Sequence, residues 1–153
     1  MLFRSPFRDE PDSGARTASP ARPSAQGSPE GALAAPPRPA GSDVALFERA
    51  LSASRSGRFA EALPLWDQLL ERHPKDAAAW SNRGNVRLAL GDAEGAIADQ
   101  GRAMALDPEH PDPHLNRGTA EESLGRWQAA AADYAWILER NPQEASALYN
   151  LGN

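Results

Sequence analysis

Two stretches, AAAWSNRGNVRLALGDAEGAIADQGRAMALDP (residues 77–108) and PDPHLNRGTAEESLGRWQAAAADYAWILERNP (residues 111–142), align with one another at an offset of 34 residues. Four landmarks keep this interval along the chain: Gly57, Gly91 and Gly125; Pro74, Pro108 and Pro142; Asn82, Asn116 and Asn150; Gly84, Gly118 and Gly152. A period of this length with helical punctuation is typical of helix–turn–helix units, which stack because one unit alone cannot bury its apolar face.

The apolar residues between the landmarks predict three pairs of helices. The first pair runs from the capping residues 42–43 to the break at Gly57, and from Phe59 to the residue before Pro74. The same pattern predicts helices over 77–90 and 92–106, and over 112–124 and 126–139. Because Pro64 falls inside the second helix, we expect that helix to kink or to start late.

Each unit also carries a set of small and aromatic residues at matching positions. These are Leu46, Ala50, Gly57, Phe59, Ala62, Trp66 and Pro74; then Trp80, Gly84, Gly91, Ala96, Ala103 and Pro108; then Gly118, Gly125, Trp127, Ala130, Tyr134 and Pro142. With these residues the chain resembles the tetratricopeptide repeat family. The resemblance implies an all-α fold, a right-handed superhelical array of antiparallel helix pairs (an α-solenoid).

The resemblance implies repeats at about 43–76, 77–110 and 111–144, and a partial fourth repeat at 145–153. In repeat two, Gln100 stands where the family commonly has an aromatic residue, so we expect a thinner core there. Since the chain stops inside the fourth repeat, we expect it to be a fragment that leaves Leu148 and Leu151 exposed, with self-association through this uncapped repeat as one consequence.

The first 42 residues differ in composition from the rest. They hold eight of the fourteen prolines, and their large apolar residues are Leu2, Phe3, Phe7 and Leu33. Such a segment buries too little surface to offset its ordering entropy, so we expect a disordered Pro/Ala/Ser/Arg-rich tail over 1–42 and a repeat domain over 43–153. The tail has some features of an organellar transit peptide, but its four acidic residues argue against one. We expect a cytoplasmic protein, with the interior of a plastid or mitochondrion as the alternative.

Several functional classes are disfavoured by composition. Residues 43–153 carry seventeen acidic and eleven basic side chains, which disfavours a nucleic-acid-binding surface. The chain has no cysteine, no apolar run long enough to span a membrane and no glycine-rich phosphate loop. His110 and His114 have metal-like spacing, but Pro111 and Pro113 lie between them and interrupt the helix that such a site needs. We therefore expect no enzyme, no cofactor and no metal site.

In the family, the first helix of each repeat lines a concave groove. The resemblance therefore implies a peptide groove formed by Phe47, Leu51, Ser81, Asn82, Asn85, Leu115, Asn116, Thr119, Tyr149 and Asn150. The repeated asparagines at 82, 116 and 150 suit an extended peptide, because a primary amide both donates to and accepts from peptide groups. The alternative is that they satisfy local backbone groups.

One subclass of the family grips C-terminal carboxylates with basic residues beside such asparagines. Here the flanking positions are Phe47, Ser81, Asp112, Leu115 and Ser146, none of which is basic, so we do not expect a carboxylate clamp.

Arginine also recurs, at 49, 83 and 117, next to the asparagine series. These arginines either form a basic stripe for an acidic partner or pair with Asp99 and Asp133 of the second helices. We favour the pairing, because a partly buried guanidinium needs a planar anionic partner.

The leading functional hypothesis is a protein–protein interaction scaffold that binds a peptide segment of an unidentified partner and thereby assembles or delivers a complex. The alternative is a regulatory or targeting arm of a larger enzyme whose catalytic domain lies beyond Asn153.

Overall fold

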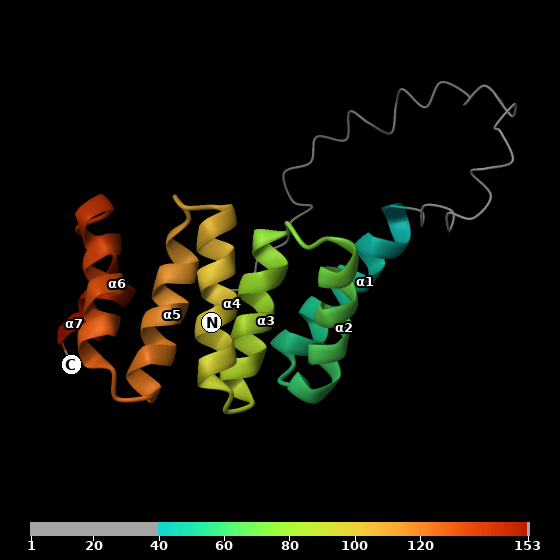
Figure 1. Cartoon of the computed structure of the whole chain (residues 1–153), viewed down its shortest axis with the longest axis horizontal. Coiled ribbons are helices and arrows are strands. Elements are labelled where there is room, and N and C mark those ends of the chain that lie inside the picture. Colours follow the sequence, from blue (N-terminus) through green and yellow to red (C-terminus); the bar gives the residue numbers. More distant parts are fainter. Residues whose placement is uncertain (1–39, 153) are drawn as a thin grey trace, which may run out of the picture.

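The computed structural model describes residues 40–152, which form seven α-helices, and successive helix pairs stack in a row along the long axis of the molecule (Figure 1). Their bounds are α1 Ala40–Arg55, α2 Phe59–Arg72, α3 Ala77–Ala89, α4 Ala93–Leu106, α5 Pro111–Ser123, α6 Trp127–Arg140 and α7 Ala145–Gly152. Each helix packs against the next, and α3 also contacts α5. The predicted all-α solenoid of antiparallel helix pairs is therefore confirmed.

The first helix begins earlier than the sequence suggested. α1 starts at Ala40, so three residues assigned to the tail are helical. A proline restricts mainly the residue before it, and a helix can therefore begin directly after Pro39. The prediction of a disordered tail otherwise concerns residues 1–39, which lie outside the described residues.

The turn inside each repeat depends on a glycine. Gly57, Gly91 and Gly125 have φ values of 73°, 89° and 70°, in the left-handed region that glycine adopts without a steric penalty. The side chain of Asp76 caps α3 by accepting from the backbone N–H of Ala79, and Asp92 caps α4 in the same way. These residues set where the helices begin and end, at the intervals that the 34-residue period indicates.

Pro64 does not delay the second helix, and the expected late start is wrong. α2 runs without interruption from Phe59 through Pro64 to Arg72. The missing N–H of Pro64 removes the bond that would reach the carbonyl of Ala60, and both residues are exposed to solvent. Water can therefore hydrogen-bond to that carbonyl, which makes the proline tolerable on this face.

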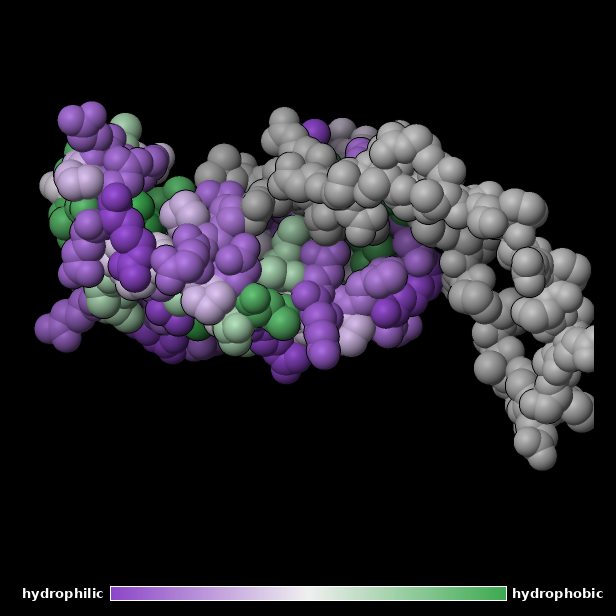
Figure 2. All heavy atoms as spheres, turned by 90° about the horizontal axis from the view of Figure 1, so that it is seen from above, coloured by the Kyte–Doolittle hydropathy of each residue, from purple (hydrophilic) through white to green (hydrophobic). Residues whose placement is uncertain are grey.

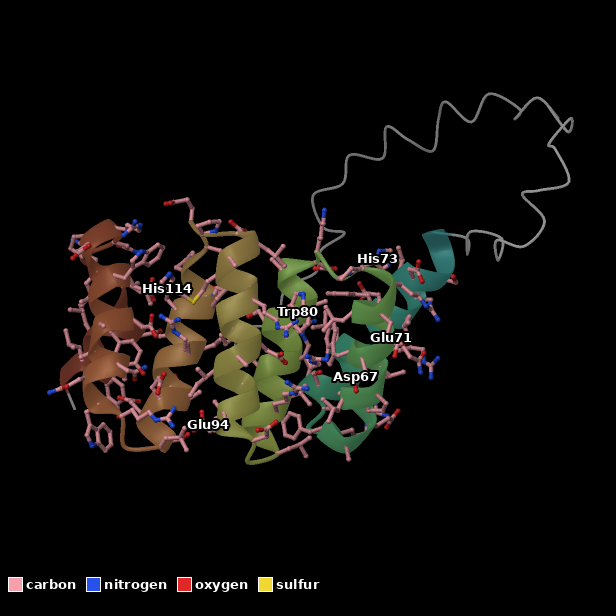
Figure 3. All side chains as sticks on the ribbon, in the orientation of Figure 1. Asp67, Glu71, His73, Trp80, Glu94 and His114 are labelled. Carbon is pink, nitrogen blue, oxygen red and sulfur yellow. The ribbon has the colours of Figure 1, made fainter. Side chains whose placement is uncertain are left out.

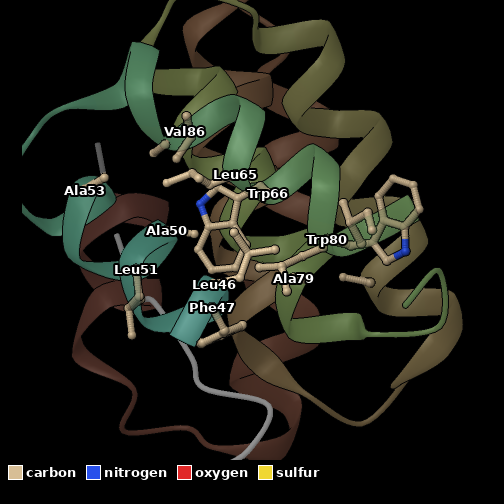
Figure 4. Packing of buried hydrophobic residues seen from close by; sticks show 14 residues of the cluster. Leu46, Phe47, Ala50, Leu51, Ala53, Leu65, Trp66, Ala79, Trp80 and Val86 are labelled. Carbon is tan, nitrogen blue, oxygen red and sulfur yellow. The ribbon is translucent and has the colours of Figure 1, made fainter. Parts of the chain in front are cut away.

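The apolar core is divided between the two ends of the row. At the α1–α3 end, Phe47 and Trp66 are fully buried and meet edge to face with ring centroids 5.0 Å apart (Figure 4). The indole N–H of Trp66 donates to Ser54 Oγ at 2.9 Å. At the other end, a smaller cluster has four buried members, Ala130, Tyr134, Ile137 and Ala147. Between the two ends, the second repeat has a more polar interior.

The face of the array that is seen from above is mostly polar (Figure 2). In the space-filling view of one face, hydrophilic residues cover most of the described surface and apolar residues emerge in patches between them (Figure 2). Among the helices of residues 40–152, none combines the length and the apolar content that crossing a membrane would require.

Candidate functional site

The first helices of successive repeats border an open cavity of about 480 Å³. Its wall comes entirely from α3, α5 and α7, and we call it the first-helix cavity. The lining residues are Asn85, Leu88, Leu115, Asn116, Thr119, Ala145, Ser146, Tyr149 and Asn150. Six of the ten groove residues expected from the sequence therefore lie together on one wall: Asn85, Leu115, Asn116, Thr119, Tyr149 and Asn150.

The lining residues differ in how far a ligand can reach them. Asn85 and Asn116 are buried and form the floor of the cavity. Leu88, Leu115 and Asn150 are half-buried. Tyr149 is 71% exposed, and the exposed residues Thr119 and Ser146 also belong to the accessible rim. The cavity thus offers polar and apolar groups to a ligand at its rim and amides at its floor.

Phe47 and Leu51 are core residues rather than groove residues. Phe47 has no exposed surface and Leu51 is 4% exposed, and both belong to the cluster around Trp66 (Figure 4). In repeat one the indole of Trp66 reaches across from α2, and these α1 side chains pack around it. The groove position inferred for them from the resemblance is wrong for this repeat.

Ser81 and Asn82 also lie outside the cavity lining. Asn82 is fully buried, so a ligand cannot reach its side chain in this structure. Ser81 is 6% exposed, and its hydroxyl accepts a long hydrogen bond of 3.4 Å from the Asn116 amide. Of the three repeated asparagines, Asn116 and Asn150 line the cavity and Asn82 does not.

Gln100 makes the second repeat polar rather than thin. It is 1% exposed, and its amide N–H groups donate to the carbonyl of Ser81 at 3.0 Å and to Asn85 Oδ1 at 3.1 Å. Its own Oε1 is buried without a partner among the described residues. Gln100 stands at the position of Trp66 and Tyr134 in the other repeats. Where those repeats bury an aromatic ring, repeat two therefore has an amide that hydrogen-bonds to Asn85 on the cavity floor.

Two of the three repeated arginines, those of repeats two and three, pair with the aspartates across the repeat, as favoured from the sequence. Arg83 forms a bidentate contact with Asp99 (Nε–Oδ2 and Nη2–Oδ1, both 2.8 Å). Arg117 does the same with Asp133 at 2.7 Å for each bond, and this hydrogen bonding raises the pKa of Arg117 above its ordinary value. Arg49 is exposed, and Leu65 occupies the position in α2 that the aspartates occupy in α4 and α6.

Arg83 links two repeats as well as two helices. Its Nη1 lies 2.8 Å from Asp67 Oδ1 on α2, and its guanidinium carbon lies 4.7 Å from the centre of the Trp80 ring (Figure 3). The guanidinium of Arg102 lies over the same ring at 4.6 Å. The contacts among α2, α3 and α4 therefore include charged and cation–π interactions.

The two closely spaced histidines have separate structural roles. α5 begins at Pro111, so Pro111 and Pro113 lie in its first turn and do not interrupt the helix as the sequence suggested. His110 precedes the helix, and its Nδ1 accepts from the backbone N–H of Asp112. His114 points toward α6, where its Nδ1 lies 2.9 Å from Asp133 Oδ1 and its ring stacks on Trp136 at 3.7 Å (Figure 3).

The fold and cavity together define a class of protein. A row of antiparallel helix pairs with a 34-residue period, hollowed along its first helices, is a helical-repeat scaffold for protein binding. The particular family follows from comparison with known proteins. The family profile described as "Tetratricopeptide repeat" matches residues 47–111 and 115–153, and the chain belongs to this family.

Known relatives share the repeat region. The chain is 31% identical over 85 residues to the TPR repeat-containing thioredoxin TDX of Arabidopsis thaliana, a match that covers 56% of this chain and 22% of the relative. The chain thus spans about a fifth of that protein's length. The TPR domain of Arabidopsis OM64 superposes with a TM-score of 0.68 at 28% identity, covering 71% of this chain and 89% of that one.

A further solved neighbour has a bound ligand. The first TPR of Spaghetti (RPAP3), bound to the HSP90 peptide SRMEEVD, superposes with a TM-score of 0.68 at 24% identity, covering 71% of this chain and 86% of that one. At this identity the likeness establishes the shared fold.

Proposed function

We propose that this chain is a protein-interaction scaffold that holds a peptide segment of a partner in the first-helix cavity and so assembles or delivers a complex. The observation that carries the proposal is the cavity itself. Its wall comes from the first helices of three successive repeats, and it brings the amides of Asn116 and Asn150 together with the exposed ring of Tyr149. Amides of this kind can donate to and accept from the peptide groups of an extended segment.

The chemistry of the wall supports binding rather than catalysis. Asn, Ser and Thr side chains fix the orientation of a ligand, while Leu88 and Leu115 supply apolar contact area. Solved neighbours of the same fold include one with a bound peptide. The Arg83–Asp99 and Arg117–Asp133 contacts join the two helices of repeats two and three behind the wall.

The test is affinity capture with the full chain. The wild-type chain and a Tyr149→Ala, Asn150→Ala double variant are immobilised and exposed to the same cell extract. We expect the wild type to retain a defined protein and the double variant to lose it, with equal helical content by circular dichroism. Arg49→Ala, an exposed change on α1 outside the cavity, is the matched control and should retain the partner. Retention by all three chains would place recognition on another face.

We propose a second function, the regulatory or targeting arm of a larger enzyme, because a relative in which the matching repeats occupy 22% of the length is a thioredoxin. The peptide composition of the native protein distinguishes the two. An antibody raised against residues 40–152 isolates the native product, and mass spectrometry of its peptides should detect a catalytic domain if an enzyme is attached and repeat sequence alone if the scaffold acts by itself.

A further inference from the structure

Among residues 40–152, the side chains that line the first-helix cavity carry no charge. All nine lining residues are Asn, Leu, Thr, Ala, Ser or Tyr. An ionised carboxylate that enters such a site loses hydration, and a buried charge is costly unless a partner charge and hydrogen bonds replace its water. The cavity therefore favours a ligand without charge at the point of contact.

The basic side chains on the wall helices are engaged elsewhere. On α3, Arg83 contacts Asp67 and Asp99, and Arg87 Nη1 lies 3.2 Å from Asp99 Oδ1. On α5, Arg117 is bidentate to Asp133. Within Ala145–Gly152 the sequence of α7 contains no basic residue. Recruiting one of these arginines for an anionic ligand would leave Asp99 or Asp133, both buried, short of its countercharge.

The accessible part of the wall offers a seat for an apolar side chain. Leu88 and Leu115 are half-buried, and Tyr149 is an aromatic residue with most of its surface exposed. An aromatic side chain that a ligand covers on binding can contribute strongly to affinity, because it buries a large area at a low cost in side-chain entropy. The volume of about 480 Å³ lies within the range of about 300–1,000 Å³ that is typical of ligand sites.

We propose that the first-helix cavity takes an internal, uncharged segment of a partner chain rather than a chain end with its carboxylate. An apolar side chain of that segment sits among Leu88, Leu115 and Tyr149, and its peptide groups meet the amides of Asn116 and Asn150. This inference rests on the proposed function and specifies the class of ligand.

Two peptide libraries test the inference. The full chain is panned against seven-residue random segments displayed between fixed flanks, and against the same segments displayed with a free C-terminus. We expect enrichment in the internal library of segments with an apolar residue and no charge at the core. We expect no enrichment of terminal acidic motifs in the other library.

Binding of synthetic peptides supplies the matched measurement. By calorimetry, the best internal peptide should bind the wild-type chain, and SRMEEVD, the peptide bound by the Spaghetti neighbour, should not. Tyr149→Ala should lower the affinity for the internal peptide by about tenfold or more. The Arg49→Ala variant should bind the internal peptide with the same affinity as the wild type. Because both side chains are exposed, neither change removes a core contact.

The possible outcomes separate this inference from the proposed function. Enrichment of acidic C-terminal segments, lost in Tyr149→Ala, would overturn the inference and leave peptide binding in the cavity intact. Failure of both libraries to enrich any segment would overturn both proposals. Competition by a synthetic peptide of residues 1–39, or a dimer in sedimentation that Tyr149→Ala abolishes, would identify the occupant as this chain and contradict a partner segment.

Discussion

Glycines inside the helices of this chain serve two different purposes. Gly118 on α5 lies against the ring of Tyr134, and a Cβ added there would overlap that ring. Gly101 on α4 has open space where a Cβ would stand. The first glycine is therefore required for close packing of two helices, whereas the second only lowers helix propensity.

This contrast predicts opposite effects of the same substitution. Gly118→Ala should lower the free energy of unfolding by about 1–3 kcal/mol, because the buried Tyr134 ring must shift. Gly101→Ala should raise it by about 0.5–1 kcal/mol, the difference in helix propensity. Urea denaturation followed by circular dichroism measures both. Equal destabilisation by the two changes would show that the seam at Gly118 can relax.

Residue roles could be predicted from the sequence where they are local and could not where they depend on a neighbour. The turn glycines and the arginine–aspartate pairs follow from the 34-residue period. The burial of Phe47 and Asn82 does not, because it depends on which side chain crosses from the facing helix. That side chain is Trp66 in repeat one, Gln100 in repeat two and Tyr134 in repeat three, so equivalent positions have different surroundings.

At the scale of elements, the charged contact between α3 and α4 is a buried pair whose members depend on each other. The side chain of Arg83 is 13% exposed and that of Asp99 is 2% exposed. Removing the arginine leaves a buried carboxylate with the contact to Arg87 as compensation, whereas removing both charges leaves a site that apolar residues can fill. Repeat one already shows an apolar residue, Leu65, at the aspartate position.

We therefore predict that Arg83→Met costs about 3 kcal/mol of unfolding free energy, and that Asp99→Leu added to it restores most of the loss. Thermal or urea unfolding of the two variants measures the difference. If the double variant were as unstable as the single one, the buried charge of Asp99 would not be the cause of the loss.

The seam between α5 and α6 should respond to pH through His114. Burial lowers the pKa of His114 from its ordinary value of 6.5; Asp133 opposes this shift, and Arg117 and Arg140 add to it. The unfolded chain therefore takes up the proton at a higher pH than the folded chain does. It follows that the free energy of unfolding should decrease as the pH falls below about 6.5.

Urea unfolding at about pH 7.5 and about pH 5.5 checks this expectation. His114→Gln, which cannot titrate, should show a smaller decrease over the same interval. Equal decreases in the wild type and the variant would assign the effect to other groups.

At the scale of the whole molecule, the period predicts the order of helices and which helices of successive repeats share a wall. It does not predict where along the array that wall opens. The cavity opens between α3, α5 and α7. Phe47 and Leu51, α1 residues that are equivalent to lining residues, are instead packed into the core around Trp66. The position of the open part of the groove thus depends on side chains that differ between repeats. A repeat pattern shows only what the repeats have in common, so it does not predict that position.

The array should also be unequal in local stability. α7 has eight residues, and Ala147 is its buried residue in the described structure, whereas α3 buries seven residues. Opening α7 exposes little apolar surface, so its amides should exchange with deuterium faster than those of α3 to α6. Yet α7 carries Ser146, Tyr149 and Asn150 of the cavity wall.

Peptide binding should therefore be visible as protection of α7. Hydrogen exchange followed by mass spectrometry, with and without the best internal peptide, should show slower exchange in Ala145–Gly152 because a ligand that binds the closed wall stabilises it by mass action. α4 does not line the cavity and serves as the internal control. Protection that rises equally in α4 would indicate global stabilisation rather than closure of the wall, and protection confined to α1 and α2 would place the ligand at the other end of the array.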